Sequence, residues 1–499
     1  MNRKEFELHV QKLKGGRSKE DASKIAAFFA ALDRKGSLPS SQYNMLREQF
    51  LEAFEYYLDH GSDVNEAVGR LSAERLGDFF YDKSDAFYTL DNAAIVYPLG
   101  MKFGTMPMFR LSATSKEDVI PCLLQIALDF TVRRFPIFST VVKTGFFWHY
   151  LESAHYVPVV EEESEIPCKP ISILMRSTRS FRVIYFKKRI SIEFFHVLTD
   201  GSGGLVFLKT LLREYFRLLG IESPVQEDIL DITEPPKEEE MVNEFERAKG
   251  EDDLNTFFDK PSLQMDGRLT AVNPSGVLHY EMDTDQLKEI SRRYGGTITA
   301  YLLAVMFEAT VPCVKASKGI FNIQVPVNMR KFNGSKTLRN YSMYFSASMD
   351  VSKIPERETL VKEMNRQLKE KGSFEIMNHM MMTTGRLIRS VSRVPVFLKA
   401  PVVQVAYGYL GNGIIGNTLS NLGVVKMPEE LRGHIDHFDF VLIAGRPNRE
   451  TCSLISYEGK TRFTVISATS DKRFEQEMYN RLTEDGLKVN LEGSIGYGS

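Results

Sequence analysis

The sequence has few cysteines, and they follow no pattern that would bind a metal or form a disulfide framework. Among 499 residues there are only four, and they are widely scattered, with no C-x-x-C pair. Small secreted domains and zinc sites both need closely spaced cysteines, so neither class fits. We therefore expect free thiols in a reducing cytoplasm. The four are Cys122, Cys168, Cys313 and Cys452.

The sequence also lacks a long apolar run. A membrane-spanning helix needs about 18 or more consecutive apolar residues. The best candidate, 400–425, is interrupted by Gln404 and three asparagines. The first residues, Met1–Glu7, are charged and contain no apolar segment typical of a signal peptide. We expect no membrane span and a cytoplasmic protein.

The sequence also has no large excess of positive or negative charge. The formal net charge is −2, with no dominant basic block, which argues against nucleic acid as the main partner. Apolar residues make up 43% and charged residues 26%, as in ordinary globular proteins. A chain of this length has enough apolar material for two or three domains.

Patterning divides the chain into four parts. Residues 1–85 show helical periodicity only, and this appendage either packs on the rest of the protein or serves as a docking element. Residues 86–220 and 262–499 mix strands with helices, which predicts an α/β fold with two lobes. The segment 221–261 is polar, acidic and marked by prolines, which indicates a connection between the lobes.

Individual elements follow from local signals. In the first lobe, Thr114 and Glu117 have capping-box spacing, which predicts a helix from there to Arg134. Residues 182–186 and 190–196 read as a hairpin. In the second lobe, alternation and helical spacing predict these elements: strands over 277–282, 319–327, 344–351, 438–443 and 453–469, and helices over 284–294, 297–308, 358–371 and 474–482.

One stretch of the first lobe, 190–207, combines a strand, a turn and a helix. Alternating residues through Phe194 predict a strand. The turn formers from Thr199 to Gly204 end it, and leucines at helical spacing follow from Leu205. This places His196 where a rigid strand meets a glycine-rich turn.

The residue types at this turn suggest acid–base chemistry. A neutral imidazole with an ordinary pKa of about 6.5 can take a proton from a hydroxyl, an amine or a thiol. Asp200, four residues after His196, can fix the local backbone or anchor a cation. Alternatively, His196 is a buried structural histidine and Asp200 an ordinary turn residue.

The spelling His196-x-x-x-Asp200-Gly201 resembles the H-x-x-x-D-G motif of the chloramphenicol acetyltransferase-like superfamily. That group includes peptide-synthetase condensation domains, plant BAHD acyltransferases, wax ester synthases and bacterial alcohol acetyltransferases. The chain is most similar to the alcohol acetyltransferase branch, from about Tyr88 onward. The resemblance implies two related lobes of mixed sheets flanked by helices, with the active site in a channel between them.

The resemblance also implies roles for individual residues. His196 would be the general base for direct transfer of an acyl group, with no acyl-enzyme. Asp200 would belong to the catalytic motif and pair with an arginine, for which Arg330, in a P-V-x-x-R segment, is the candidate. Asn340 stands at the spacing of a family asparagine, and Ser420 and Asn421 lie in an S-N-x-G segment. We expect these last three to contact substrate.

We therefore predict an acyltransferase that moves an acyl group, such as acetyl, from acyl-CoA to a small alcohol or amine. Acyl-CoA is then a co-substrate, and no other cofactor is expected. One alternative is a condensation enzyme that uses an acyl carrier protein, although Phe195 replaces the second histidine of many condensation domains. Another is a non-catalytic relative that binds a ligand. The D-F-G-W-G motif of plant enzymes is absent.

Two further patterns invite other functions. Gly411 to Gly416 spells G-x-G-x-x-G, but a dinucleotide site needs a helix to follow, and the next residues are strand-like. Four residues of metal-ligand type lie close together without a zinc spacing. We expect a solvated loop there. These four are His434, Asp436, His437 and Asp439.

Overall fold

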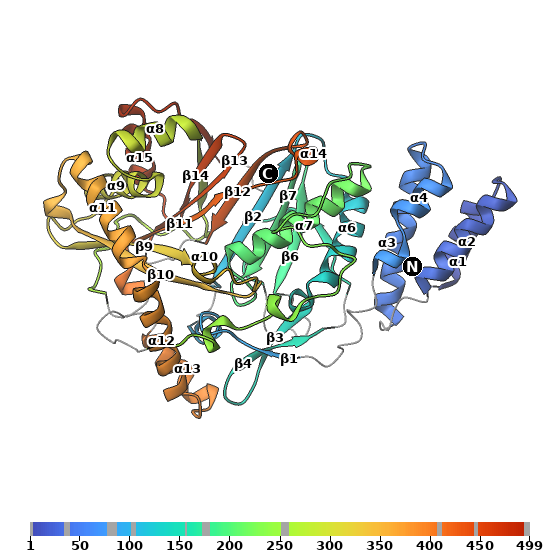
Figure 1. Cartoon of the computed structure of the whole chain (residues 1–499), viewed down its shortest axis with the longest axis horizontal. Coiled ribbons are helices and arrows are strands. Elements are labelled where there is room, and N and C mark those ends of the chain that lie inside the picture. Colours follow the sequence, from blue (N-terminus) through green and yellow to red (C-terminus); the bar gives the residue numbers. More distant parts are fainter. Residues whose placement is uncertain are drawn as a thin grey trace.

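The computed structural model shows two α/β lobes side by side and a helical appendage at one end (Figure 1). One five-stranded and one seven-stranded sheet form the lobes, and helices pack against both. The structure describes residues 3–33, 40–76, 87–100, 106–154, 157–171, 180–250, 259–406, 412–443 and 448–493.

The first lobe is built on a five-stranded sheet of order β12-β2-β7-β6-β5. All neighbours are antiparallel except β5 and β6. The predicted hairpin is confirmed as β6 and β7, which pair from Phe181↔Phe194 to Phe186↔Arg189. The strands are β2 (Met108–Ser115), β5 (Val160–Glu162), β6 (Phe181–Phe186), β7 (Arg189–Phe195) and β12 (Ile435–Leu442).

Two helices, α6 (Pro121–Arg134) and α7 (Gly201–Leu218), pack together in this lobe. The predicted capping box at Thr114 was wrong, because Thr114 pairs with Arg189 inside the sheet and α6 begins only at Pro121. Proline is well suited to a first helical position, where its missing N–H has no partner to lose.

The second lobe contains a seven-stranded mixed sheet of order β10-β9-β11-β13-β14-β8-β15. Strands β9, β11 and β13 run parallel, and the other neighbours are antiparallel. The strands are β8 (Gly276–Asp283), β9 (Ile320–Asn328), β10 (Ser342–Asp350), β11 (Asn417–Val424), β13 (Glu450–Tyr457), β14 (Lys460–Ser467) and β15 (Asn490–Gly493). The elements predicted here are confirmed to within a few residues, with 453–469 divided into β13 and β14, and 438–443 found as β12 of the five-stranded sheet.

Helix α9 is deeply buried in the second lobe, with nearly all its apolar side chains in the core. It packs against α8, α11 and α15. The helices are α8 (Thr284–Arg293), α9 (Ile298–Thr310), α10 (Arg330–Asn333), α11 (Arg357–Lys371), α12 (Phe374–Ser390), α13 (Val396–Ala406), α14 (Glu429–Arg432) and α15 (Arg473–Glu484).

No single described helix is long and apolar enough to cross a membrane. One pair bent by 75°, Thr284–Arg293 with Ile298–Cys313, meets the length and composition test only when the two are counted together.

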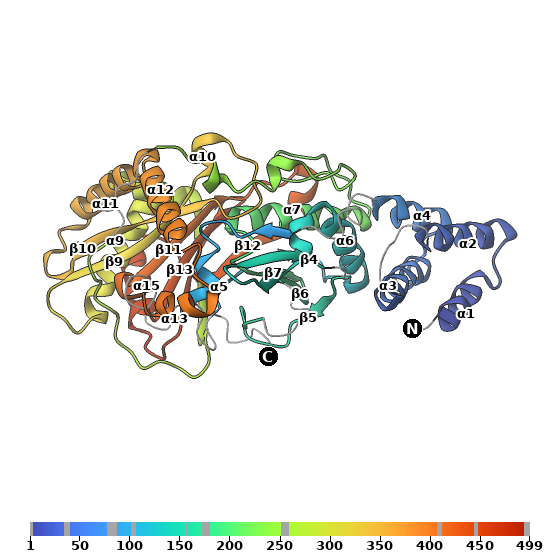
Figure 2. The ribbon, with the colours of Figure 1, turned by 90° about the horizontal axis from the view of Figure 1, so that it is seen from below.

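A small antiparallel sheet of order β1-β4-β3 lies below the first lobe in Figure 1. Its strands β3 and β4 form a hairpin whose tip holds Phe146 and Phe147. The short helix α5 (Val96–Gly100) packs against α13 from the other lobe (Figure 2). The strands are β1 (Phe87–Thr89), β3 (Thr140–Thr144) and β4 (His149–Ser153).

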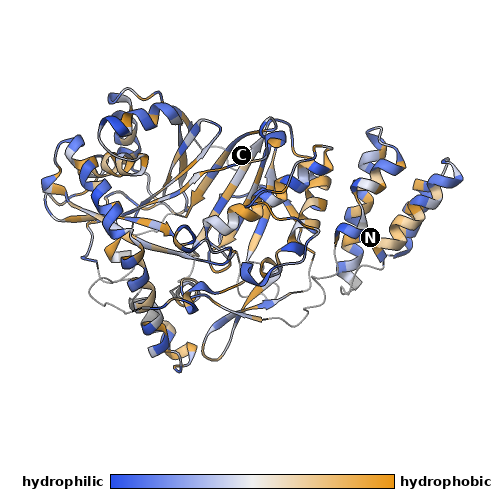
Figure 3. Cartoon of the chain, in the orientation of Figure 1, coloured by the Kyte–Doolittle hydropathy of each residue, from blue (hydrophilic) through white to orange (hydrophobic). Residues whose placement is uncertain are grey.

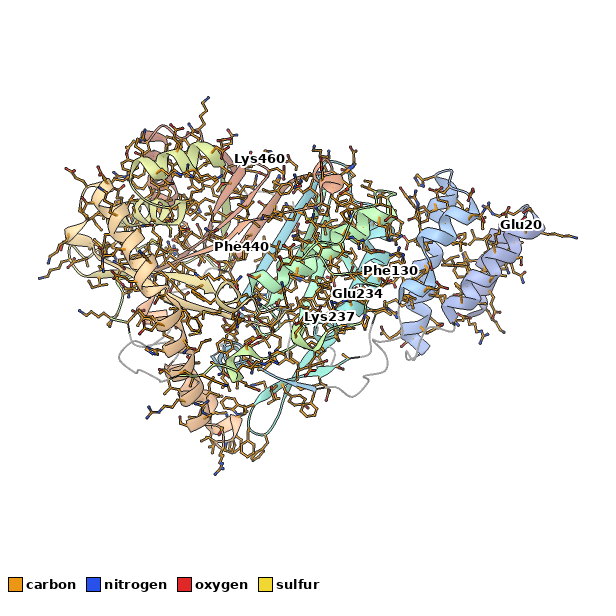
Figure 4. The ribbon with its side chains drawn as sticks, in the orientation of Figure 1. Glu20, Phe130, Glu234, Lys237, Phe440 and Lys460 are labelled. Atoms are coloured by element: carbon orange, nitrogen blue, oxygen red, sulfur yellow. The ribbon has the colours of Figure 1, made fainter. Side chains whose placement is uncertain are left out.

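The N-terminal appendage packs on the first lobe, the first of the two alternatives. Phe50 of α3 meets Phe130 of α6 with ring centroids 5.8 Å apart, and Figure 4 shows Phe130 on the side that faces the appendage. Tyr57 also donates a hydrogen bond of 2.7 Å to the carbonyl oxygen of Leu218. The helices are α1 (Arg3–Lys14), α2 (Lys19–Asp33), α3 (Ser40–Asp59) and α4 (Val64–Arg70).

The acidic connection between the lobes is not a free linker. Glu240 is buried, and its carboxylate accepts hydrogen bonds from Nη1 and Nη2 of Arg134, both at 2.6 Å. Its carbonyl oxygen accepts from the N–H of Leu338 at 2.7 Å. The charge of Glu240 therefore fastens this segment to the first lobe, and its backbone fastens it to the second.

One strand departs from the division at 262–499. Strand β12 comes late in the chain but pairs with β2 in the five-stranded sheet of the first lobe. It also lies against β13 and β14 of the other sheet, and Figure 4 shows its Phe440 between the lobes. Strand pairing between distant segments is not encoded in local pattern, so the sequence did not reveal this exchange.

A buried polar cluster holds this strand to the second sheet. Asp439 on β12 accepts from Arg462 at 2.7 Å and lies 3.6 Å from His279 on β8 and 3.5 Å from His437. Burial lowers the pKa of His279 to about 4, against the opposite effect of Asp439. The pKa of His437 is raised, because its contacts with Asp439 and Asp436 outweigh its burial.

His279 should make stability depend on pH. The folded protein keeps this ring neutral down to about pH 4, whereas the unfolded chain binds the proton near pH 6.5. Stability is therefore present above about pH 6.5 and falls as pH drops towards about 4, by about 3 kcal/mol for this group. Urea unfolding across this range should show a shallower fall for His279→Gln than for the native protein. The surface change His60→Gln is the control, and an equal fall in all three proteins would contradict the assignment.

Candidate active site

His196 lies directly after β7 and before α7, as the sequence predicted. Its backbone N–H donates to the carbonyl oxygen of Pro107 at 2.9 Å, which continues the strand pairing by one residue. The imidazole is half-buried between two aromatic rings, Tyr97 with centroids 5.1 Å apart and Phe109 with centroids 5.2 Å apart. These contacts hold the ring on a rigid support.

One nitrogen of the ring is bound by the second lobe. Nδ1 of His196 lies 2.9 Å from Oδ1 of Asn340, which immediately precedes Tyr341 and β10. An amide oxygen can only accept, so Nδ1 carries the proton in this bond. The other nitrogen, Nε2, then has a free lone pair and can act as a base.

The direction of the Asn340 amide is fixed from its far side. Its Nδ2 donates to Oδ2 of Asp91 at 3.1 Å. Asp91 is buried, also accepts from the N–H of Ala94 at 2.8 Å, and lies 3.9 Å from Nε of Arg339. Burial raises the pKa of Asp91, against the lowering effect of Arg339. The acceptor Asp91 therefore turns the amide nitrogen away from His196 and its oxygen towards it.

Sequence reasoning missed part of this arrangement. Asn340 was expected to contact substrate, but its side chain is buried and its amide is occupied by His196 and Asp91. A buried amide needs partners at both ends, and these two supply them. No motif marked Asp91, and only its placement beside the site in the folded chain reveals it.

Asp200 points away from the imidazole and into the second lobe. One oxygen accepts from Nη1 of Arg330 and from the N–H of Tyr341, both at 2.8 Å, and the other accepts from the N–H of Gly203 at 3.0 Å. Burial raises the pKa of Asp200. The charge of Arg330 and these hydrogen bonds lower the pKa by more than burial raises it, so the net shift is downward. The predicted pairing with Arg330 is present, and Asp200 also caps α7.

Glycines allow the two lobes to meet closely at this turn. A Cβ on Gly203 would lie 2.4 Å from the carbonyl oxygen of Leu338, so no side chain fits there. A Cβ on Gly201 would lie 2.7 Å from the Leu422 side chain on β11. In addition, Thr199 donates to the same Leu338 oxygen at 2.6 Å. The motif turn is thus pressed against the second lobe at several points.

The segment around Ser420 and Asn421 forms the end of β11. Asn421 is exposed, donates to Thr299 at 3.0 Å and accepts from the N–H of Gly423 at 2.7 Å. Ser420 is half-buried and stands opposite Ser453 in the sheet. The contact of Leu422 with the motif turn places this strand beside the site, and the expected substrate contacts of Ser420 and Asn421 stay predictions.

Neither the G-x-G-x-x-G spelling nor the residues of metal-ligand type in 434–439 forms the site that its pattern could suggest. After Gly416 the chain continues as β11, a strand as expected, whereas a dinucleotide site requires a helix. His437 and Asp439 belong to the buried cluster on β12, so the expected solvated loop was wrong there. Within the described parts of the chain, no three His, Cys, Asp or Glu side chains come together as a metal site would need.

Comparison with known proteins identifies the fold by structure alone. No family model and no curated protein sequence matches the chain. Solved structures do match, among them the first condensation domain of the calcium-dependent antibiotic synthetase, with a TM-score of 0.56 and 12% identity. That match covers 82% of this chain and 100% of the condensation domain.

Two further matches have similar strength. Polyketide synthase associated protein 5 from Mycobacterium tuberculosis has a TM-score of 0.54 at 12% identity, over 80% of this chain and 98% of its own. Trichothecene 15-O-acetyltransferase from Fusarium sporotrichioides has a TM-score of 0.52 at 11% identity, over 81% of this chain and 94% of its own. The chain therefore has the two-lobed chloramphenicol acetyltransferase-like fold.

The link between Asp200 and Arg330 can be measured. Asp200→Asn and Arg330→Gln should each lower stability by roughly 3–5 kcal/mol, because each leaves a buried charge or its partner unpaired. The double variant should be little worse than either single one. A double-mutant cycle in urea gives the coupling energy, and Lys315→Gln, a substitution of an exposed cation outside this ion pair, controls for charge alone. Additive losses would show that the two side chains do not share an interaction.

Proposed function

We propose that this protein is an acyltransferase that moves an acyl group, acetyl in the first instance, from a CoA thioester to a hydroxyl or amine. The observation that carries the proposal is the hydrogen bond between Nδ1 of His196 and Oδ1 of Asn340, since it leaves Nε2 free to take a proton. The fold supports the same class. One structure that matches, an F. graminearum protein, is complexed with coenzyme A and deoxynivalenol.

The proposed reaction needs one base and two bound substrates. Nε2 of His196 removes the proton of the acceptor O–H or N–H as that atom attacks the thioester carbonyl carbon. The tetrahedral intermediate then collapses, the carbon–sulfur bond breaks, and the imidazolium returns the proton to the departing CoA thiolate. Positioning both substrates at one imidazole supplies much of the rate. None of these reaction steps requires an acyl-enzyme, a metal or another cofactor.

Asp200 acts indirectly in this scheme. Its carboxylate faces Arg330 and not the imidazole, so it fixes the turn that carries His196. The cytoplasmic location expected from the free thiols is part of the same proposal, because acyl-CoA is an intracellular donor. A carrier-protein thioester as donor is the alternative, and the donor panel below separates the two.

His196→Ala should fold normally and lose activity. Removing a general base typically costs about 10²–10⁴ in rate. The measurement is release of free thiol from acetyl-CoA with a panel of alcohols and amines, repeated with an acyl carrier thioester as donor. His60→Ala is the matched control, since His60 is exposed on the appendage. Activity within a few-fold of the native protein at saturating acceptor would remove His196 from the role, and turnover only with the carrier donor would favour the alternative.

Asn340 offers a finer test of the same site. Asn340→Leu removes the acceptor from Nδ1, and kcat should fall on the order of 10- to 100-fold, the usual effect of a misplaced catalytic group. Asn340→Asp keeps an acceptor for Nδ1, provided that the new carboxyl group shares one proton with Asp91, and should retain more activity. The pH profile should also change, because a carboxylate beside the ring favours its protonated form. Equal activities of the two variants would show that the hydrogen bond to Nδ1 does not position the base.

A further inference from the structure

Two segments that are distant in sequence both lack acidic residues. There is no Asp or Glu between Glu375 and Glu429, nor between Asp129 and Glu152, although the chain has 65 acidic residues in 499. The first segment contains α12 after Glu375 and all of α13, and the second contains the β3–β4 hairpin up to Leu151. Figure 1 shows these elements together at the lower edge of the molecule.

Direct contacts join the two segments. The N–H of Val396, at the start of α13, donates to the carbonyl oxygen of Phe146 at the hairpin tip, at 2.9 Å. Nζ of Lys399 lies 2.9 Å from the centroid of the Trp148 ring. Lys399 is buried, and its burial lowers its pKa to about 8. The tip of the hairpin and the start of α13 therefore form one continuous surface.

Large apolar side chains are exposed on this surface. Phe146 is 66% exposed and Phe397 is 67% exposed, and Phe147 and Leu398 beside them are exposed as well. Single exposed apolar residues are ordinary, but a cluster on two adjoining elements marks an interaction site. In Figure 3, hydrophobic and hydrophilic colouring alternates along α12 and α13.

Two arginines come shortly before the exposed residues of α13 in the chain. Arg389 on α12 and Arg393 just after it are both exposed. Within the residues that the structure describes, neither has a carboxylate at ion-pair distance. We call this surface the arginine–phenylalanine face and define it by Phe146, Phe147, Arg389, Arg393, Phe397 and Leu398.

We propose that the arginine–phenylalanine face docks on an anionic phospholipid membrane. Exposed phenylalanine and leucine enter the boundary between headgroups and acyl chains, while arginines attract anionic lipids. The apolar side chains sit at a hairpin tip and a helix start on the outer edge of the molecule, so they can meet a planar surface together. A protein partner would need matching pockets for them instead.

The helix that carries part of this face is connected to the candidate active site through α5. Helix α13 packs on α5, and Tyr97 of α5 contacts the His196 ring. A docked membrane would therefore lie next to the wall of the site, where a lipid-dissolved acceptor or donor could enter. The docking proposal goes beyond the acyl transfer and does not depend on it.

The test is sedimentation of the full chain with vesicles. We expect it to pellet with phosphatidylcholine vesicles that contain phosphatidylglycerol, and much less with phosphatidylcholine alone. Raising the salt from about 0.1 M to about 1 M should release it, since salt screens the attraction between exposed charges. Arg389→Gln with Arg393→Gln should weaken binding by about 30-fold, the amount expected for two arginines near an anionic surface.

Matched variants separate this face from general stickiness. Phe146→Ser with Phe147→Ser should also reduce vesicle binding, by about 10-fold or more, because two exposed rings no longer enter the bilayer. Two control variants should bind as the native protein does. One is Leu8→Ser with Leu491→Ser, at leucines that are 56% and 48% exposed outside this face. The other is Lys315→Gln with Lys318→Gln, at exposed lysines. All variants should keep native unfolding temperatures.

Several results would overturn the proposal. The native protein would fail to pellet with either vesicle, or both face variants would pellet as well as the controls. Gel filtration could instead show a dimer that Phe146→Ser with Phe147→Ser converts to a monomer, which would make a second copy the occupant. Binding to an acidic carrier protein, lost in the arginine variant and without vesicle binding, would assign the face to that partner.

Discussion

The carboxylate of Asp200 accepts hydrogen bonds from both lobes. Gly203, in the helix that follows the motif turn, binds one oxygen, and Arg330 and Tyr341 from the second lobe bind the other. Because an ionised carboxylate is costly to bury without partners, this arrangement holds only when the lobes are correctly placed. The turn that carries His196 is therefore positioned by the second lobe as much as by its own strand.

The same loop of the second lobe also sets the chemistry of the imidazole. Asn340 stands next to Tyr341, so the contact that fixes Asp200 brings the Asn340 amide to Nδ1 of His196. Asp91 on the far side orients that amide. Three separated parts of the chain thus decide which nitrogen is free, and a base prepared in this way needs little rearrangement when substrates bind.

Sequence reasoning succeeded where the signal was local. The strand, turn and helix around His196 follow from alternation, glycines and leucine spacing, and the two-lobed α/β fold follows from mixed elements in two blocks. It failed where long-range contacts decide. The exchange of β12 into the first sheet, the partners of Asn340 and the role of Asp91 depend on pairing in space, and Thr114 matched a helix signal that sheet pairing overrode.

In this mechanism Asn340 keeps the proton on Nδ1 of His196 and leaves Nε2 free. The most direct measurement is ¹⁵N NMR of the histidine side chains above neutral pH, with His196→Gln used to assign the His196 signals. We expect a protonated Nδ1 and an unprotonated Nε2, and a loss of this preference in Asn340→Leu. A native spectrum in which Nε2 carries the proton would contradict this assignment. Such a ring could not take a proton at Nε2 from the substrate hydroxyl or amine.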